Sequence, residues 1–387
     1  MPVKAVLLVG PGRLTVTRGS LRLLGYDLNP GDSVIVPAGR RLPALLGDES
    51  GFEFTGRVEE YSIDSYRTLE EYSARAREGD RILVVGPSDS GKSTLSAFIV
   101  NTLASEGRDP LYATVDVGQN EAFCPGYASS AQPNPLIVPG SQGRLLRACF
   151  VGSFTPREQA YKYIACSSRV IAGWSGPLIV DTDGWIAPWE GLESKVALAH
   201  TVRADTIVAV GMDERAVGFI RDTVPWARVI RVPKLVEGVK SREERRIHRE
   251  RLIAKALLGA STIRISMERA RIYGLPLFQG PPVDPAEASR LTGVRVLYAE
   301  VQSSGLLVVA RSKPRNRLPR IRVLLEGWER GLLASVMDRG SPTPAVLLGI
   351  DYRSKSITLA SKAEGEDYIE VGKARVDPDS VLGKAKW

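Results

Sequence analysis

The sequence predicts an α/β protein with a mostly parallel central sheet, flanked by β-rich domains at both ends of the chain. Three observations lead to this fold class. Apolar strand-like runs alternate with helical segments between about residues 76 and 262. A glycine-rich loop joins the first of these strands to the helix that follows it. The segments on either side contain short apolar stretches separated by Gly, Pro and Asn, which favour turns.

Residues 1–75 are predicted to form the β-rich N-terminal domain. Apolar stretches at 5–9, 14–16 and 33–37 have the length of strands, and Gly and Pro turns separate them. Residues 70–77 are predicted as a short helix that leads into the central domain.

Residues 76–262 are predicted to form the central α/β domain. Strands separated by helices imply a parallel sheet with helices on both faces. The helix after the first strand, residues 93–105, carries apolar residues at helical spacing. The predicted strands are 81–85, 111–115, 178–180, 206–210 and 229–232.

Residues 263–387 are predicted to form a β-rich C-terminal domain. Within it, residues 311–322 hold six Lys and Arg residues broken by two prolines, and we expect an extended loop that either contacts nucleic acid or is simply exposed. The predicted strands are 293–300, 305–310, 345–351 and 356–360.

Composition limits the class of protein. The 387 residues suffice for two or three domains, and 43% hydrophobic and 25% charged residues are typical of a soluble globular protein. No apolar run reaches the roughly 18 residues that a membrane helix needs. The apolar start of the chain runs into Gly10-Pro11-Gly12, which indicates a strand and turn rather than a signal peptide.

The cysteines and the net charge bear on location and partners. Cys124, Cys149 and Cys166 are odd in number and lack CxxC spacing, so we expect neither a disulfide framework nor a zinc site, and a cytoplasmic location. The net charge of +8 favours a polyanionic partner, because Lys and Arg release counterions when they neutralise phosphates. An Arg-rich surface of ion pairs explains the charge equally well.

The glycine-rich loop GPSDSGKS fits the pattern GxxxxGK[ST] and stands between a predicted strand and a predicted helix, as a P-loop requires. Its glycines let the backbone wrap round phosphates, and amides at the helix start point at the anion. Lys92 adds a charge near the β- and γ-phosphates, and Ser93 is suited to Mg²⁺. The chain lacks the NKxD sequence of Ras-like GTPases and the LSGGQ sequence of transporter ATPases. We therefore predict a nucleoside triphosphate ligand, ATP.

Two predicted strands run into aspartates. Strand 111–115 is followed by Asp116, and strand 178–180 by Asp181 and Asp183. Ligands of open α/β sheets bind at the carboxyl ends of strands. One aspartate could orient Mg²⁺ and one could accept a proton from an attacking hydroxyl, although either could simply begin a turn.

Two polar or aromatic positions near these strands have open roles. Thr155, before Pro156, either caps a helix that begins at Arg157 or holds a phosphate. Trp185, after Gly184, either stacks on a base or belongs to the core.

Residues 239–255 are predicted as a strongly basic helix that follows the last strand of the sheet. Spacing places four arginines on one helix face. Such a helix either provides positive charge over a γ-phosphate, as a kinase lid does, or is a solvated, ion-paired helix. The four are Arg242, Arg245, Arg246 and Arg249.

Taken in order, these motifs resemble the polynucleotide 5′-hydroxyl kinases, a family that includes the kinase-like subunit of the eukaryotic pre-mRNA cleavage factor and kinases of ribosomal-RNA processing. The resemblance covers most of the chain and suggests a prokaryotic or archaeal type. It rests on GPSDSGKST, YATVDVGQNEAFCPG, FVGSFTP, IVDTDGW and the basic helix. The family also has β-rich domains on both sides of its kinase core.

The resemblance implies a role for each matching residue. Asp116 would be the general base and a metal ligand, and Gln119 would hold water or substrate. Thr155 would belong to a clasp on the phosphates and the substrate, and Trp185 would stack on the terminal nucleotide. Arg245 and Arg249 would act as catalytic lid residues, with Lys240 or Arg242 as the first lid residue. The nucleotide and metal would be held by Gly86, Ser88, Asp89, Ser90, Gly91, Lys92, Ser93 and Thr94.

The activity implied is transfer of the ATP γ-phosphate to the 5′-hydroxyl of RNA, and also of DNA, with Mg²⁺. Two other functions stay open. A non-catalytic ATP-binding scaffold of an RNA-processing complex would keep the P-loop without a working base or lid. A small-molecule kinase would need no basic track for its acceptor.

Overall fold

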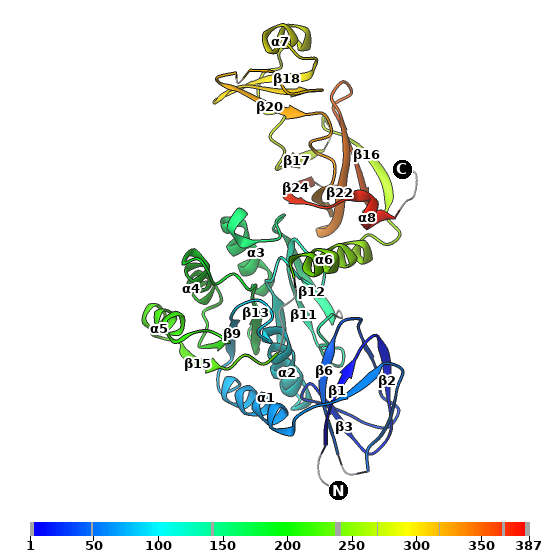
Figure 1. Cartoon of the computed structure of the whole chain (residues 1–387), viewed down its shortest axis with the longest axis vertical. Coiled ribbons are helices and arrows are strands. Elements are labelled where there is room, and N and C mark those ends of the chain that lie inside the picture. Colours follow the sequence, from blue (N-terminus) through cyan, green and yellow to red (C-terminus); the bar gives the residue numbers. More distant parts are fainter. Residues whose placement is uncertain are drawn as a thin grey trace. The chain divides into compact units, whose positions relative to one another are not determined.

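The protein folds as two compact units, residues 1–249 and 250–387, each of which we describe by itself (Figure 1). The predicted three-domain division stays a prediction; the first unit holds both the N-terminal β-rich part and the α/β core. The computed structural model describes residues 4–47, 49–140, 143–236, 241–268, 270–316, 318–365 and 368–383.

The N-terminal part of the first unit consists of two antiparallel sheets, with strand orders β4-β3-β6-β1-β8 and β5-β2-β7. Their inward side chains, such as Leu14 and Val16 of β2, are fully buried. The prediction of a β-rich segment is confirmed. The strands are β1 (Lys4–Val9), β2 (Gly12–Arg18), β3 (Leu21–Leu23), β4 (Tyr26–Leu28), β5 (Ser33–Val36), β6 (Arg41–Leu46), β7 (Gly51–Phe54) and β8 (Arg57–Glu60).

A seven-stranded sheet forms the α/β core, in the order β12-β11-β10-β13-β9-β14-β15. The last five are parallel, and β11 and β12 are antiparallel additions at one edge. The mostly parallel sheet is therefore confirmed. The strands are β9 (Arg81–Val85), β10 (Leu111–Thr114), β11 (Tyr127–Gln132), β12 (Arg144–Phe150), β13 (Leu178–Asp181), β14 (Thr206–Val210) and β15 (Arg228–Val232).

Helices cover both faces of this sheet because its strands are buried on both sides. On β9, Ile82 and Val84 join the core under α1 and α2, whereas Leu83 and Val85 face the core under α3, α4 and α5. The first of these cores continues into the N-terminal sheets. The helices are α1 (Ile63–Ala76), α2 (Lys92–Ser105), the 3₁₀ turn η1 (Pro156–Glu158), α3 (Ala160–Ile171), α4 (Glu190–Val202), α5 (Glu214–Thr223) and α6 (Arg242–Ala256).

The helix predicted at 70–77 begins earlier, at Ile63. The Ser62 side chain accepts a hydrogen bond from the Ser65 amide and so caps the helix N-terminus. None of the helices in the described ranges is long and apolar enough to cross a membrane.

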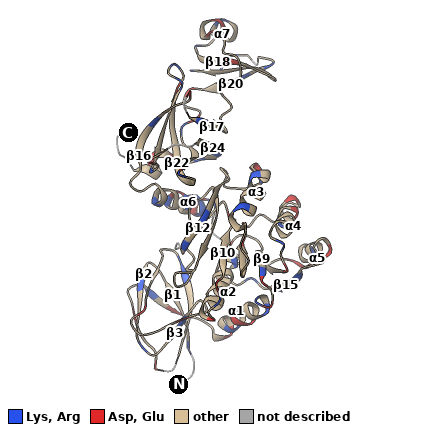
Figure 2. Cartoon of the chain, turned by 180° about the vertical axis from the view of Figure 1, so that it is seen from behind, with Lys and Arg blue, Asp and Glu red and all other residues tan. Residues whose placement is uncertain are grey.

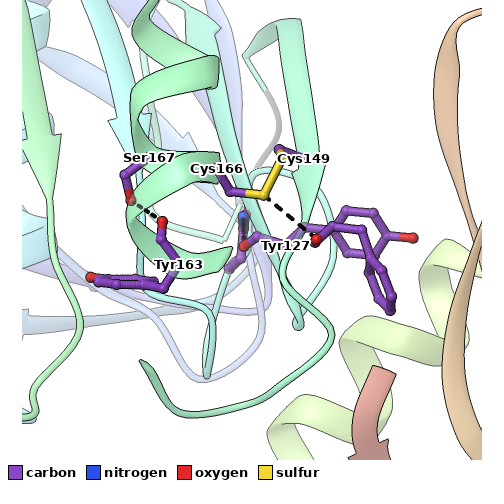
Figure 3. The surroundings of a disulfide bond; sticks show 7 residues. Tyr127, Cys149, Tyr163, Cys166 and Ser167 are labelled. Atoms are coloured by element: carbon purple, nitrogen blue, oxygen red, sulfur yellow. Dashed lines mark hydrogen bonds between the residues drawn. A yellow bond between two sulfur atoms is a disulfide. The ribbon is translucent and has the colours of Figure 1, made fainter. Parts of the chain in front are cut away.

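Cys149 at the end of β12 and Cys166 in α3 form a disulfide (Figure 3). The prediction that the cysteines form no disulfide is wrong, because the fold brings residues 17 apart in sequence to a Cα–Cα distance of 5.3 Å. In the same helix, the Ser167 hydroxyl donates to the carbonyl oxygen of Tyr163 (Figure 3). The bridge ties the antiparallel edge of the sheet to the helix layer.

The second unit contains a six-stranded sheet, β16-β23-β22-β21-β24-β17, and a three-stranded sheet, β18-β19-β20, against which α7 packs. Its predicted β character is confirmed. The elements are β16 (Ser261–Ser266), β17 (Arg271–Tyr273), α7 (Pro285–Thr292), β18 (Val296–Gln302), β19 (Gly305–Ala310), β20 (Ile321–Leu325), β21 (Leu332–Asp338), β22 (Ser341–Asp351), β23 (Ser356–Ser361), β24 (Tyr368–Arg375) and α8 (Pro378–Leu382).

Replacing both bridged cysteines by serine, C149S with C166S, should lower the free energy of unfolding of the first unit by about 3 kcal/mol, because the bridge closes a short loop in the unfolded chain. The melting temperature should fall by roughly 6–12 °C. Calorimetry with and without reductant checks this. The wild type should lose stability when reduced and the double variant should not respond; a wild type insensitive to reductant would contradict the pairing.

Candidate functional site

A cavity of about 550 Å³ opens at the carboxyl ends of the parallel strands in the first unit. The P-loop forms its floor, and Asp116, Gln119 and Asp181 line it from the strand ends. Residues 39–42 of the N-terminal part and residues 137–140 form further walls. The cavity has the position at which open α/β sheets bind ligands.

The P-loop spans Gly86–Gly91, between β9 and α2, in the context that the motif predicted. Gly86 has φ of +149°, and a Cβ there would lie 2.1 Å from the carbonyl oxygen of Val210, so only glycine fits. Residues 88–94 line the cavity. The amides at the start of α2 therefore face the space that a phosphate chain would occupy.

The Lys92 side chain lies across the loop that precedes it. Its Nζ donates to the carbonyl oxygen of Pro87 at 2.8 Å, and the residue is buried. Burial lowers the pKa of Lys92, while the carboxylates of Asp181 and Asp116 oppose that shift. A bound phosphate would give this ammonium group a further anionic partner.

Asp181, the last residue of β13, lies beside the first turn of α2. The Tyr112 hydroxyl donates to its Oδ2 at 3.0 Å, whereas Oδ1 is buried and has no hydrogen-bond partner within the described residues. Burial raises the pKa of Asp181, and the charge of Lys92 and the hydroxyl of Ser93 oppose the rise. Mg²⁺ prefers oxygen ligands beside nucleotide phosphates. The Ser93 hydroxyl and the Asp181 carboxylate fit that ion.

Asp116 follows β10, and its Oδ1 accepts the backbone N–H groups of Gly118 and Gln119, each at 3.0 Å. Burial and repulsion from Asp183 raise the pKa of Asp116 to about 6, against the attraction of Lys92. A carboxylate with this pKa is ionised at neutral pH yet basic enough to accept a proton from a hydroxyl. Of the residues that line the cavity, Asp116 is thus suited to be a general base. Oδ1 of Asp116 already accepts two amides, so Asp181 fits the metal ion better than Asp116 does.

Asp183 belongs to a buried network next to the loop. Its Oδ2 accepts from Lys195 Nζ at 2.6 Å and from the Tyr163 hydroxyl at 2.7 Å, and its Oδ1 accepts the Trp185 amide at 2.8 Å. Gly184 allows this segment to touch the P-loop, because a Cβ there would lie 2.5 Å from the Ser88 amide nitrogen. Trp185 is half-buried and does not line the cavity.

The segment with Thr155 forms a tight turn at the end of β12. The buried Ser153 hydroxyl donates to the carbonyl oxygen of Thr155 and lies 2.7 Å from Glu158 Oε2. A helix beginning at Arg157 is not found: a 3₁₀ turn begins at Pro156, and the Thr155 side chain makes no capping bond to it. The Thr155 side chain is therefore left for another role, although it does not line the cavity.

The basic helix α6 begins in the first unit. Figure 2 shows the Lys and Arg residues of this helix in blue. Ser241 and Glu244 form a capping box: the Glu244 amide donates to Ser241 Oγ at 3.1 Å, and the Ser241 amide donates to Glu244 Oε2 at 2.6 Å. This cap sets where the helix begins. Arg245 pairs with Asp89 of the P-loop at 3.2 Å, and the Arg249 guanidinium lies 5.2 Å from the ring centroid of Phe154.

The four arginines predicted on one face do not all face the site. Arg246 pairs with Glu243 on the exposed side of the helix, at 2.5 Å, and Arg242 is exposed. Arg245 and Arg249 are the two that reach the P-loop and the Thr155 turn. Lys240, the other candidate for the first lid residue, lies outside the described residues.

Sequence reasoning missed the contribution of the N-terminal part. Arg40 lines the cavity and forms an ion pair with Glu121, which also lies 2.7 Å from Nε2 of His248 on α6. Tyr112, on β10, was also missed as the partner of Asp181. No local motif marks these residues, because each acquires its role through a contact with a distant segment.

Comparison with known proteins finds relatives of this chain. Residues 86–256 match the family model described as the P-loop of the mRNA cleavage and polyadenylation factor CLP1. The chain is 25% identical over 280 residues to the polyribonucleotide 5′-hydroxyl-kinase Clp1 of Homo sapiens, covering 64% of each protein. It is 29% identical over 328 residues to a polyribonucleotide 5′-hydroxyl-kinase of Pyrococcus furiosus, covering 77% of this chain and 88% of that protein.

The fold also resembles a solved structure. The wild-type Clp1p in complex with Pcf11p matches with a TM-score of 0.57 over 96% of this chain and 98% of that chain, at 13% identity. At this identity the likeness concerns the fold alone. The matched region spans just under two thirds of the mammalian relatives' length. The family recognised from the ordered motifs is confirmed.

Proposed function

We propose, from the premise that residues 86–256 belong to the CLP1 P-loop family, that this protein is a polynucleotide 5′-hydroxyl kinase. It transfers the γ-phosphate of ATP to the 5′-hydroxyl of RNA. One observation carries the proposal: Asp116, with its pKa raised to about 6, shares a cavity with the P-loop and Lys92. A base, a phosphate cradle and a cation within one cavity are what phosphoryl transfer to a hydroxyl requires.

In this proposal ATP lies with its phosphates along residues 88–94. Lys92 leaves the carbonyl oxygen of Pro87 for the phosphates. Ser93 and Asp181 would hold Mg²⁺, which when bound neutralises charge on the β- and γ-phosphates. The remaining P-loop residues, Ser88, Asp89, Ser90, Gly91 and Thr94, shape the cradle. The rest of the nucleotide would lie in the part of the cavity that Arg40 and residues 137–140 line.

In the transfer step, Asp116 accepts the proton of the attacking hydroxyl. The RNA 5′-oxygen forms a bond to the γ-phosphorus while the bond from that phosphorus to the bridging oxygen of ADP breaks, and ADP leaves with the electron pair. The hydroxyl proton goes to the Asp116 carboxylate and is later released to water. Gln119, whose amide also binds Asp116, lies where it can orient the attacking hydroxyl.

Arg245 and Arg249 provide the positive charge that the transferring phosphoryl group needs. Arg245 pairs with Asp89 and Arg249 lies over the ring of Phe154, so both are next to the P-loop and the Thr155 turn. The family resemblance assigns Thr155 to a phosphate of the acceptor or donor and Trp185 to the terminal base, and both residues lie outside the lining of the cavity itself. DNA with a 5′-hydroxyl is a second acceptor for the same site.

The alternative is a scaffold that binds ATP without turnover, within an RNA-processing complex. A solved neighbour is a complex of Clp1p with the protein Pcf11p, so a protein partner is a reasonable expectation for this chain too. The intact set of Asp116, Lys92 and Arg245 favours the enzyme. We also propose a cytoplasmic location, where ATP and RNA both occur; because Cys149 and Cys166 are bridged, the cysteines do not support this location.

Replacing Asp116 by asparagine should abolish measurable transfer, a loss of roughly 10²–10⁴-fold in kcat. The amide cannot accept the proton, while the P-loop is unchanged, so ATP affinity should stay within a few-fold. Single-turnover transfer and nucleotide titration measure the two quantities. Asp64→Asn, an exposed change on α1, is the control. Full transfer by the Asp116 variant would rule out this base.

The pH profile of kcat/KM should fall on the acid side with a midpoint of about 6. The base must be ionised to act, and burial raises the pKa of Asp116 from its usual value near 4, so activity is lost as the pH falls through 6. Initial rates between pH 4.5 and 8.5 test this. A profile flat down to pH 5 would contradict a raised pKa at the base.

Arg245→Ala should reduce kcat on the order of 10³-fold, because it removes a cation from the developing charge. Arg246→Ala, one residue along the same helix but paired with Glu243 in solvent, is the matched control and should leave kcat within about two-fold. Equal losses in the two variants would show that the helix acts only through its overall charge.

A further inference from the structure

The three-stranded sheet of the second unit carries a second cavity, of about 540 Å³. Its walls come from the β18–β19 turn, the loop that follows β19, and the first residues of β20. The side chains on which the inference depends are Ser304, Lys313, Asn316, Arg320 and Arg322.

The cavity is strongly basic. Residues 311–322 contain six Lys and Arg and no Asp or Glu. Lys313, Arg320 and Arg322 are exposed, and within the described ranges none of the three has an ion-pair partner. Arg311, at the edge of the loop, differs because it pairs with Glu326 at 3.3 Å. No carboxylate lines the cavity among the described residues, so its charge is available to an anion.

The end of the loop, at Arg320 and Ile321, is held in place by backbone pairing with β19. The Leu306 amide donates to the carbonyl oxygen of Arg320 at 2.8 Å, and Ile321 continues the loop into a parallel pairing of β20 with β19. Gly305 permits this approach, because a Cβ there would lie 2.0 Å from the Arg320 carbonyl oxygen. A backbone fixed at this end of the loop loses less conformational entropy on binding than a mobile one would.

We propose that this cavity, which we call the basic pocket, binds the phosphodiester backbone of a single-stranded polynucleotide. The proposal rests on the proposed kinase function for the identity of the anion. Three separate cations suit a chain of repeated phosphates better than a single small anion. Ser304 and Asn316 add neutral groups for ribose and phosphate oxygens. No aromatic side chain lines the basic pocket in the described ranges, so recognition is independent of base sequence.

The test is a triple variant of the full chain, with Lys313, Arg320 and Arg322 each changed to Gln. Its affinity for a labelled 20-nucleotide single-stranded RNA, measured by fluorescence anisotropy without ATP, should fall on the order of 100-fold at 0.1 M salt. The slope of log affinity against log salt should become shallower by roughly 2, about 0.7 for each lost phosphate contact. Transfer from ATP to a trinucleotide acceptor should be unchanged.

The matched control changes the same number of exposed cations on the six-stranded sheet of the same unit, Arg271, Lys355 and Lys362, each to Gln. It should keep wild-type affinity and salt slope. Equal losses in both triple variants would overturn the basic pocket as a specific site, and so would an unchanged affinity in the first. If the triple variant of Lys313, Arg320 and Arg322 weakens binding of polyglutamate but not of RNA, the occupant is an acidic protein and the proposal is wrong. Failure of the kinase function is a separate result: wild-type protein that binds RNA but transfers no phosphate.

Discussion

Three carboxylates (Asp116, Asp181 and Asp183) and the ammonium groups of Lys92 and Lys195 lie together near the carboxyl ends of β10 and β13, all of them buried except the half-buried Asp116. The architecture of the site depends on keeping them there. Burial, and then repulsion from Asp183, raises the pKa of Asp116 to about 6, so ionised carboxylates here need stabilising partners. Each carboxylate is therefore held by its own partners: two amides for Asp116, Tyr112 for Asp181, and Lys195 with Tyr163 for Asp183. Removing one partner of a buried pair such as Asp183–Lys195 leaves an uncompensated charge, a loss of roughly 3–5 kcal/mol.

The three carboxylates of this cluster are suited to different chemical roles. Asp183 is fully engaged and supports the contact of Gly184 with the P-loop. Among the described residues, one oxygen of Asp181 has no hydrogen-bond partner; it lies next to Ser93, which suits a metal ion. Asp116 faces the cavity with a pKa raised to about 6, which suits proton transfer. Glu121 then joins the two sides of the cavity, because Arg40 from the N-terminal part and His248 from α6 both meet it. The N-terminal part thus contributes to the walls of the cavity.

The sequence predicted the P-loop, strand β10 with Asp116, and the mostly parallel sheet of the core, because short local patterns of residues indicate each of them. Strand β11 was not predicted, because its sequence, YASSAQ, consists mostly of small and polar residues although all six are buried. The basic run predicted α6, but charge alone could not tell which arginines face the loop; the partners Asp89 and Glu243 decide that. The Cys149–Cys166 bridge and the role of Arg40 arise from tertiary contacts that no local pattern encodes.

The most direct test of the central claim is transfer of label from γ-labelled ATP to a 5′-hydroxyl oligonucleotide by the purified full chain with Mg²⁺. The account predicts labelled RNA whose label is released by phosphatase as a 5′-terminal phosphate, with a DNA oligonucleotide run in parallel to define the acceptor range. Binding of ATP with no label on either oligonucleotide would contradict the kinase assignment and leave the ATP-binding scaffold as the function of this fold.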